Sequence, residues 1–224
     1  MKPWEVLGET QTPDGTAMAL TRRDSEYVIL ANGKSLMSSL MHGSEEALAT
    51  LACPRLRAIE APSVLIGGLG MGFTLRATLD LLPPRAAVTV AELVPAVVEW
   101  NRGPLGPLAD HPLKDKRVRV VVGDVRSVLD SSRQQFDAIL LDVDNGPAPF
   151  TAAANAGLYD DRGLASARSA LKDGGVLAIW SAWDNTKFVQ RLRYAKFDVK
   201  VEHVRGRLKK GGPHHTIFIA RVAS

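Results

Sequence analysis

From about residue 60 onward, short apolar runs alternate with segments rich in helix-forming residues. The apolar runs have the length of buried strands and lie at Ser63–Ile66, Ala87–Ala91, Val118–Val122, Phe136–Leu141 and Val176–Ser181. Between them, helices are expected at Phe73–Leu82, Pro95–Asn101, Val125–Asp130 and Leu164–Leu171. Strands that alternate with helices pair in parallel through right-handed crossovers, so the pattern predicts a doubly wound α/β sheet with helices on both faces.

The pattern changes after the fifth strand. One more helix is expected at Thr186–Tyr194, and two alternating segments follow, "FDVKVEHV" and "HTIFIARV". A basic, glycine-rich loop joins these two segments, so we expect a hairpin instead of another crossover. A doubly wound, mostly parallel seven-stranded sheet that ends in an antiparallel hairpin resembles the Rossmann-like fold of S-adenosylmethionine-dependent methyltransferases.

The start of the chain differs from the rest. Tyr27–Leu30 has the composition of a strand, and the "NG" pair that follows is a strong hairpin signal, so residues 1 to about 40 are expected to form a small antiparallel β unit. A helix is expected from Ser44, which we interpret as its capping residue. We therefore divide the chain into a small N-terminal β unit with a linking helix, residues 1–60, and a main domain, residues 61–224.

Composition is that of a soluble globular protein. Hydrophobic residues make up 46% of the 224 residues and charged residues 23%. No apolar run approaches the roughly 18 residues of a membrane span, and the N-terminus does not resemble a secretory signal. Cys53 is the one cysteine, which excludes an internal disulfide and a cysteine-based metal cluster. We expect a cytoplasmic protein without a membrane partner.

The charge pattern mildly favours acidic partners, because the formal net charge is +4. Much of the excess lies in "VRGRLKKGG", where no aromatic residue interleaves with the basic ones. A solvated hairpin loop accounts for this cluster, so nucleic acid is not expected as a partner.

Several other residues receive ordinary interpretations. His42, His214 and His215 have no cysteine or carboxylate at ligand spacing, so no metal site is expected and His215 is assigned to loop and packing. Met37 and Met41 are expected in the core.

A glycine loop, "GGLGMG", directly follows the first strand of the main domain. Ligands of open parallel sheets bind beyond the carboxyl ends of the strands, where this loop is expected. Gly68, Gly70 and Gly72 form G-x-G-x-G, whereas the dinucleotide fingerprint needs a glycine where Phe73 stands. This disfavours a nicotinamide dinucleotide, and the alternative that the glycines serve strand–helix packing stays open.

Acidic residues end the next two strands. Glu92 lies twenty residues after Gly72, and a carboxylate there can accept hydrogen bonds from both hydroxyls of a ribose. Asp124 can accept a hydrogen bond from an adenine amine, cap the following helix, or do both. Leu93 and Val125, which directly follow these acids, are expected along the same nucleoside.

The fourth strand ends in "LLDVDNGP". Two carboxylates, Asp142 and Asp144, stand there beside the expected pocket. They suit a cationic amine, which they can hold and whose proton they can accept during its attack on an electrophile. The alternative is an Asx turn before "NGP". Asp142 and Asp144 are therefore the candidate catalytic residues.

In their order and spacing, "VLIGGLGMG", Glu92, "GDV" and "LLDVDNGP" resemble the spermidine synthase-like (polyamine aminopropyltransferase) branch of the class I methyltransferase fold. The resemblance runs from about Tyr27 to Leu177. It implies a sulfonium nucleoside as cofactor, and a homodimer supported by the N-terminal β unit. It also implies one role for each matched residue: Gly68, Gly70 and Gly72 wrap the nucleoside, Glu92 binds its ribose, Asp124 contacts the adenine amine, and Asp142 orients or deprotonates the attacking amine.

The chain also departs from the pattern of that family. The loop aspartate that faces the aminopropyl ammonium falls on Gly70, and a Tyr-His-Glu triplet falls on Ser44-Glu45-Glu46. Asp144 is not a simple match for the second acid of the family's Asp-Ser-x-Asp motif.

These departures order the functional hypotheses. The first is a transferase that uses S-adenosylmethionine or its decarboxylated form on a small acceptor, an amine, with methyl transfer slightly ahead of aminopropyl transfer. The second is a catalytically inactive nucleoside-binding regulatory protein, because family acids are missing. The third is a nicotinamide-dependent dehydrogenase, against which the terminal hairpin argues.

Overall fold

Two β-sheets organise the chain in the computed structural model, which describes residues 2–143, 157–207 and 212–222. The N-terminal sheet is antiparallel, as expected. Its strands run in chain order: β1 (Glu5–Gln11), β2 (Ala17–Arg23), β3 (Glu26–Ala31) and β4 (Lys34–Ser38). Asn32 and Gly33 join β3 to β4 with φ angles of 47° and 73°, the left-handed pair that a tight hairpin requires.

The main sheet has the order β10-β11-β9-β8-β5-β6-β7. Five of its strands are parallel: β5 (Ser63–Gly67), β6 (Ala87–Glu92), β7 (Val118–Val122), β8 (Phe136–Leu141) and β9 (Leu171–Ser181). The last two, β10 (Phe197–Arg205) and β11 (His214–Val222), form the antiparallel hairpin, and β11 pairs with β9. The expected doubly wound, mostly parallel seven-stranded sheet with a terminal hairpin is confirmed.

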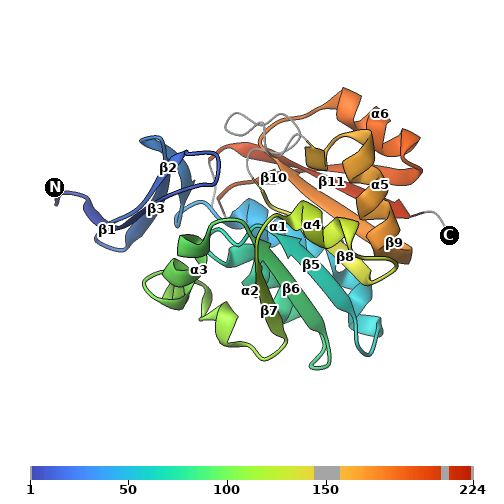
Figure 1. Ribbon diagram of the computed structural model, residues 1–224, viewed down its shortest axis with the longest axis horizontal. Coiled ribbons are helices and arrows are strands. Elements are labelled where there is room, and N and C mark those ends of the chain that lie inside the picture. Colours follow the sequence, from blue (N-terminus) through green and yellow to red (C-terminus); the bar gives the residue numbers. More distant parts are fainter. Residues whose placement is uncertain (1, 144–156, 208–211, 223–224) are drawn as a thin grey trace.

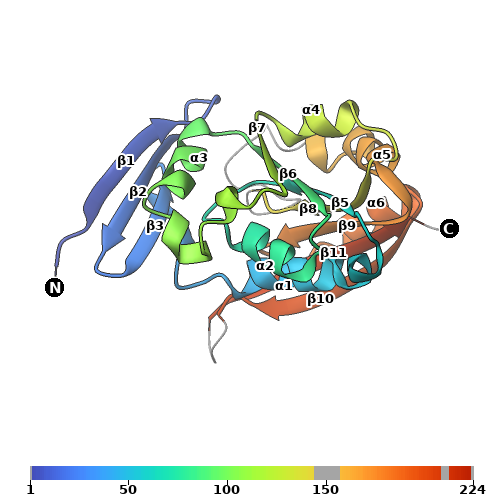
Figure 2. The ribbon, with the colours of Figure 1, turned by 90° about the horizontal axis from the view of Figure 1, so that it is seen from below.

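Helices cover both faces of this sheet (Figures 1 and 2). On one side lie α1 (Gly43–Ala52), α2 (Phe73–Leu81) and α3 (Pro95–Arg102), and on the other α4 (Val125–Asp130), α5 (Asp161–Ala170) and α6 (Thr186–Tyr194). Three short 3-10 helices complete the described elements: Pro54–Ala58, Gly106–Ala109 and Pro112–Lys114. No helix among the described residues is long and apolar enough to cross a bilayer.

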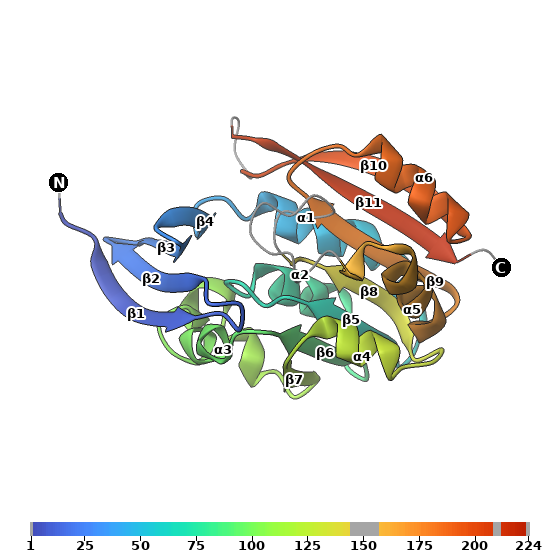
Figure 3. The ribbon, with the colours of Figure 1, turned by 45° about the horizontal axis from the view of Figure 1, so that its top comes forward.

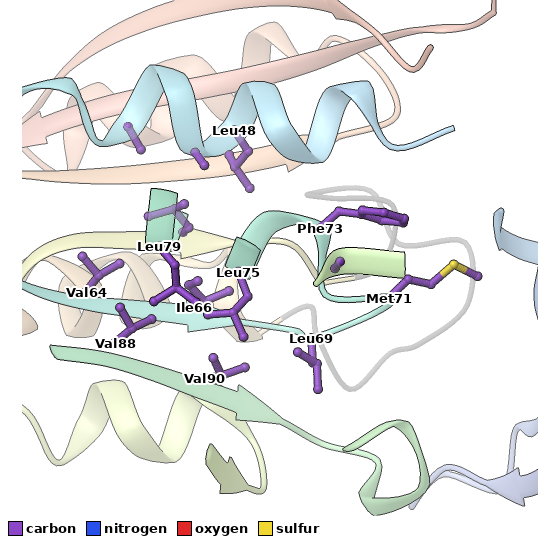
Figure 4. Close-up of a cluster of buried hydrophobic side chains, with 14 of the residues drawn as sticks. Leu48, Val64, Ile66, Leu69, Met71, Phe73, Leu75, Leu79, Val88 and Val90 are labelled. Atoms are coloured by element: carbon purple, nitrogen blue, oxygen red, sulfur yellow. The ribbon is translucent and has the colours of Figure 1, made fainter. Parts of the chain in front are cut away.

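Apolar side chains of the first helix layer meet those of the central strands. Leu75 and Leu79 on α2 join Ile66 on β5 and Val88 on β6 in one buried cluster, with Leu48 of α1 on the far side of α2 (Figure 4). The strand residues of this cluster point to one face, because successive side chains of a strand alternate between faces.

The N-terminal sheet lies at one end of the molecule, beside α3 (Figures 1 and 3). Met18, Leu20 and Ile29 of this sheet belong to the same buried cluster as the α1 and α2 side of the main sheet. The division into residues 1–60 and 61–224 stays a prediction.

Three details of the sequence-based elements were wrong. The strand expected at Val176–Ser181 begins earlier, at Leu171, because Leu171 already pairs with Phe136 of β8. Ser44 does not cap α1, because its hydroxyl donates a hydrogen bond to the carboxylate of Glu45 and accepts none from the backbone of the helix. The fifth helix begins at Asp161, earlier than the expected Leu164, because the side chain of Asp160 caps it by accepting a hydrogen bond from the backbone N–H of Gly163.

Candidate active site

A cavity of about 500 Å³ opens at the carboxyl ends of the parallel strands, on the side of the N-terminal sheet. The N-terminal sheet supplies an apolar wall to this cavity that includes Met18, Ile29, Leu36 and Met37. The opposite wall comes from the ends of β5, β6, β7, β8 and β9. Its position agrees with the rule that open parallel sheets bind ligands beyond their carboxyl edge.

Two of the three predicted nucleoside-binding glycines line the cavity, Gly68 and Gly70. Gly68 has a φ of 88°, and a Cβ added there would collide with the backbone carbonyl of Asp142, so only glycine lets the loop pass the end of β8 this closely. Gly72 lies outside the cavity lining, where an added Cβ would be 2.9 Å from Oδ1 of Asn101. Gly72 therefore serves the close packing of the residue before α2 against Asn101 and does not face the cavity.

Glu92, predicted to hold a ribose, is 7% exposed and lines the cavity together with Leu93. One carboxylate oxygen accepts a 2.8 Å hydrogen bond from the N–H of Leu69, and the other accepts a 2.9 Å bond from the N–H of Val94. Burial nevertheless raises the pKa of Glu92. Since each carboxylate oxygen can accept more than one hydrogen bond, Glu92 can fix the glycine loop and still receive hydroxyl groups from the cavity.

Asp124, predicted to contact the adenine amine, and Val125, predicted to lie along the nucleoside, also line the cavity. The Asp124 carboxylate accepts a 2.8 Å hydrogen bond from the backbone N–H of Arg126 and so caps α4. The capping alternative is thus confirmed, and the adenine contact stays a prediction that is compatible with it.

Asp142 follows β8 and faces the cavity. Its backbone N–H donates to the carbonyl of Gly67, and the hydroxyl of Thr74 donates a 2.6 Å hydrogen bond to its Oδ2. Burial raises the pKa of Asp142 to about 6, although the bond from Thr74 acts in the opposite direction. A carboxylate with a pKa near the working pH is suited to accepting a proton from an amine. Asp144 lies outside the described residues.

A second carboxylate enters the cavity from α1, and sequence reasoning did not select it. Glu45 is 7% exposed, and its Oε2 accepts a 2.7 Å hydrogen bond from the hydroxyl of Ser44. That hydroxyl lies 2.8 Å from Nδ1 of His215 on β11. Burial first, and the negative charge of Asp142 second, raise the pKa of Glu45 to about 8. The one signal in the sequence was its place in the Ser44-Glu45-Glu46 triplet.

Three further residues line the cavity although the sequence did not place them there. Met37 lies on β4 and Met41 in the following loop, and Met37 also packs against the buried cluster, so its expected place in the core is confirmed in part. His215, assigned to loop and packing, lies on β11. The ring of His215 packs against Trp180 at a centroid distance of 4.7 Å, and burial lowers the pKa of His215. Among the described residues, no cluster of His, Cys, Asp and Glu is arranged to hold a metal ion.

A comparison with protein-family models identifies the family of this chain. A model of the "Spermine/spermidine synthase domain" matches residues 41–204, more than half of the chain. The chain belongs to this family. The resemblance seen in the sequence is therefore confirmed.

The chain aligns with only part of the length of its curated relatives. The chain is 31% identical to a polyamine aminopropyltransferase of Korarchaeum cryptofilum over 133 residues, which are 59% of this chain and 39% of that protein. It is 31% identical to polyamine aminopropyltransferase 1 of Streptomyces coelicolor over 151 residues, 62% of this chain and 28% of that protein. The aligned parts thus span less than half of these relatives.

Solved spermidine synthase structures share the fold of this family member. One, in complex with the transition-state analogue AdoDATO, has a TM-score of 0.69 and 18% identity, covering 96% of this chain and 72% of that one. The spermidine synthase of Thermotoga maritima has a TM-score of 0.72 and 17% identity, with the same coverage.

Proposed function

We propose that this spermine/spermidine synthase family member is an aminopropyltransferase that uses decarboxylated S-adenosylmethionine and a small amine acceptor. The observation that carries the proposal is the carboxylate of Asp142, oriented by Thr74 and facing the cavity beside the glycine loop. The names of the curated relatives, all polyamine aminopropyltransferases, favour aminopropyl over methyl transfer. The methyl transfer that the sequence slightly favoured therefore has less support than its alternative.

In this proposal the nucleoside lies along the carboxyl ends of the parallel strands. Gly68 and Gly70 let the backbone approach the nucleoside, Glu92 accepts the ribose hydroxyls, and Asp124 accepts the adenine amine. Leu93 and Val125 lie beside these two acids along the same wall. Asp144 stays a candidate catalytic residue on sequence grounds alone.

The reaction requires alignment of the amine with the donor carbon and a group that accepts the proton of the amine. A sulfonium carbon is already electrophilic, so the chain chiefly has to place the amine nitrogen in line with it. The new C–N bond forms as the C–S bond breaks, methylthioadenosine leaves, and the nitrogen passes its proton to the Asp142 carboxylate. The apolar wall of Met18, Ile29 and Leu36 lowers the local polarity and so strengthens the charge interactions in the cavity.

An initial-rate assay tests the proposal. The protein is incubated with decarboxylated S-adenosylmethionine and a panel of diamines and polyamines, and release of methylthioadenosine is measured. We expect acceptor-dependent release that falls about 100- to 10,000-fold in Asp142→Asn, with nucleoside binding retained. Release of S-adenosylhomocysteine from S-adenosylmethionine, without methylthioadenosine, would establish methyl transfer instead. Nucleoside binding without turnover of any acceptor would support the inactive regulatory protein.

A further inference from the structure

The glycine loop has no acid where the resembling enzymes carry one, and another side chain occupies that space. A Cβ added at Gly70 would lie 2.7 Å from Cε and 3.0 Å from Sδ of Met37. The thioether of β4 therefore packs over the loop at the point where an aspartate side chain would start. Gly70 itself brings no charge to the cavity.

The cavity is nevertheless acidic. Among the described residues that line it, five are acids and none is lysine or arginine; the acids are Asp14, Glu45, Glu92, Asp124 and Asp142. No ion pair to Glu45 or Asp142 exists within the described part of the chain. His215 does not supply the missing charge, because burial lowers its pKa and favours the neutral ring. Glu45 is 7% exposed and Asp142 is half-buried, and carboxylates withdrawn from water without a cation are costly, so this pair favours a cationic ligand.

Glu45 is held so that it faces the same space as Asp142. The hydroxyl of Ser44, itself within hydrogen-bond distance of His215, fixes one oxygen of the Glu45 carboxylate. The hydroxyl of Thr74 lies 3.4 Å from the backbone carbonyl of Glu45 and donates to the side chain of Asp142. One threonine thus joins the start of α1 to the end of β8, and the two carboxylates are close enough to repel each other.

We propose that Glu45, acting with Asp142, binds the primary ammonium at the end of the donor's aminopropyl chain, and so supplies from α1 the carboxylate that the glycine loop lacks. This inference rests on the proposed function and names the residue that selects the donor. Intact S-adenosylmethionine carries an additional carboxylate at this end, which two acids repel. The decarboxylated donor presents only the ammonium, so Glu45 determines the preference between the two nucleosides.

Calorimetric titration of the full chain tests this role with three ligands. They are decarboxylated S-adenosylmethionine, S-adenosylmethionine, and methylthioadenosine, which has no charged tail. Each is titrated at pH 9 into the wild type, Glu45→Gln and the matched control Glu46→Gln. Glu46 is the adjacent glutamate of α1, it pairs with His42, and it does not line the cavity.

For Glu45→Gln we expect the dissociation constant of the decarboxylated donor to rise roughly 10- to 100-fold, since a charge-assisted hydrogen bond is lost. Methylthioadenosine should bind within about twofold of the wild type, which also shows that the cavity is folded, and S-adenosylmethionine should bind equally or more tightly. Glu46→Gln should resemble the wild type with all three ligands.

Two outcomes overturn the inference while leaving the proposed function intact. One is equal affinity of wild type and Glu45→Gln for the decarboxylated donor, and the other is an equal loss for methylthioadenosine, which would assign Glu45 to the shape of the cavity. Binding of none of the three nucleosides to the wild type overturns the proposed function and the inference with it.

Discussion

The hydroxyl of Thr74, at the start of α2, donates a 2.6 Å hydrogen bond to Oδ2 of Asp142 at the end of β8. This bond fixes the orientation of a carboxylate that otherwise faces an open cavity. It also favours the ionised form of Asp142, because a hydroxyl donor stabilises a carboxylate more than a carboxylic acid. Thr74 therefore controls both the position and the proton affinity of the proposed base.

Replacing Thr74 with valine should raise the pKa of Asp142 further above its ordinary value. Because only the ionised carboxylate accepts a proton, the acidic limb of the kcat/KM profile should move to higher pH by about one unit. Thr74→Ser keeps the hydroxyl and should retain the wild-type limb. A pH–rate profile for the three proteins gives the answer, and an unmoved limb in Thr74→Val would mean that this bond does not tune the base.

Substitution of Gly68 by alanine should unfold or severely weaken the site. The new Cβ would meet the carbonyl of Asp142, and the backbone is left-handed there. Gly174→Ala is the matched control, since Gly174 has a φ of 71° and open space around it. Denaturant unfolding should show Gly68→Ala about 3 kcal/mol less stable than Gly174→Ala. If the two variants were equally stable, the close approach of the loop to the Asp142 carbonyl would not be the reason for glycine at position 68.

The packing of Met37 over Gly70 predicts coupling between the two positions. Gly70→Ala should be destabilising in the wild type, and less so once Met37→Ala has removed the thioether from its path. A double-mutant cycle of unfolding free energies should give a coupling of about 1 kcal/mol. If the effects are additive, the left-handed backbone at Gly70, with a φ of 52°, accounts for the entire loss of stability in Gly70→Ala.

Glu45 should make stability depend on pH. Its pKa is raised to about 8, so the folded chain keeps a proton that the unfolded chain releases near pH 4. The contribution of this group is therefore fully present at low pH and is lost as the pH rises towards 8. Relative to the wild type, Glu45→Gln should gain at least about 2 kcal/mol of unfolding free energy between pH 4.5 and pH 9. If the difference in unfolding free energy between the two proteins stayed constant across this range, the raised pKa of Glu45 would be contradicted.

Local signals in the sequence were sufficient for the main sheet and part of the site. Apolar runs separated by helix formers predicted the parallel strands, and the position of Asp142 after a buried strand predicted its place at the cavity. Capping of α4 by Asp124 was also predictable from the sequence, because it depends on two residues that lie two positions apart.

Long-range contacts account for what the sequence did not predict. Ser44 resembles a helix cap, but its hydroxyl bonds to Glu45 and lies beside His215, 171 residues away. The hydrophobicity of Met37 favours burial, and only the placement of the N-terminal sheet over the glycine loop turns that side chain towards a cavity. The Ser44-Glu45-Glu46 triplet was the one signal for Glu45, and nothing in that triplet indicates that its side chain faces the same cavity as Asp142.

A crystal structure of the chain with decarboxylated S-adenosylmethionine bound is the most direct test of the central claim. The account predicts ribose hydroxyls at Glu92 and a terminal ammonium within about 3 Å of the carboxylate oxygens of Glu45 and Asp142. A nucleoside bound outside this cavity, or an ammonium turned away from both acids, would contradict it.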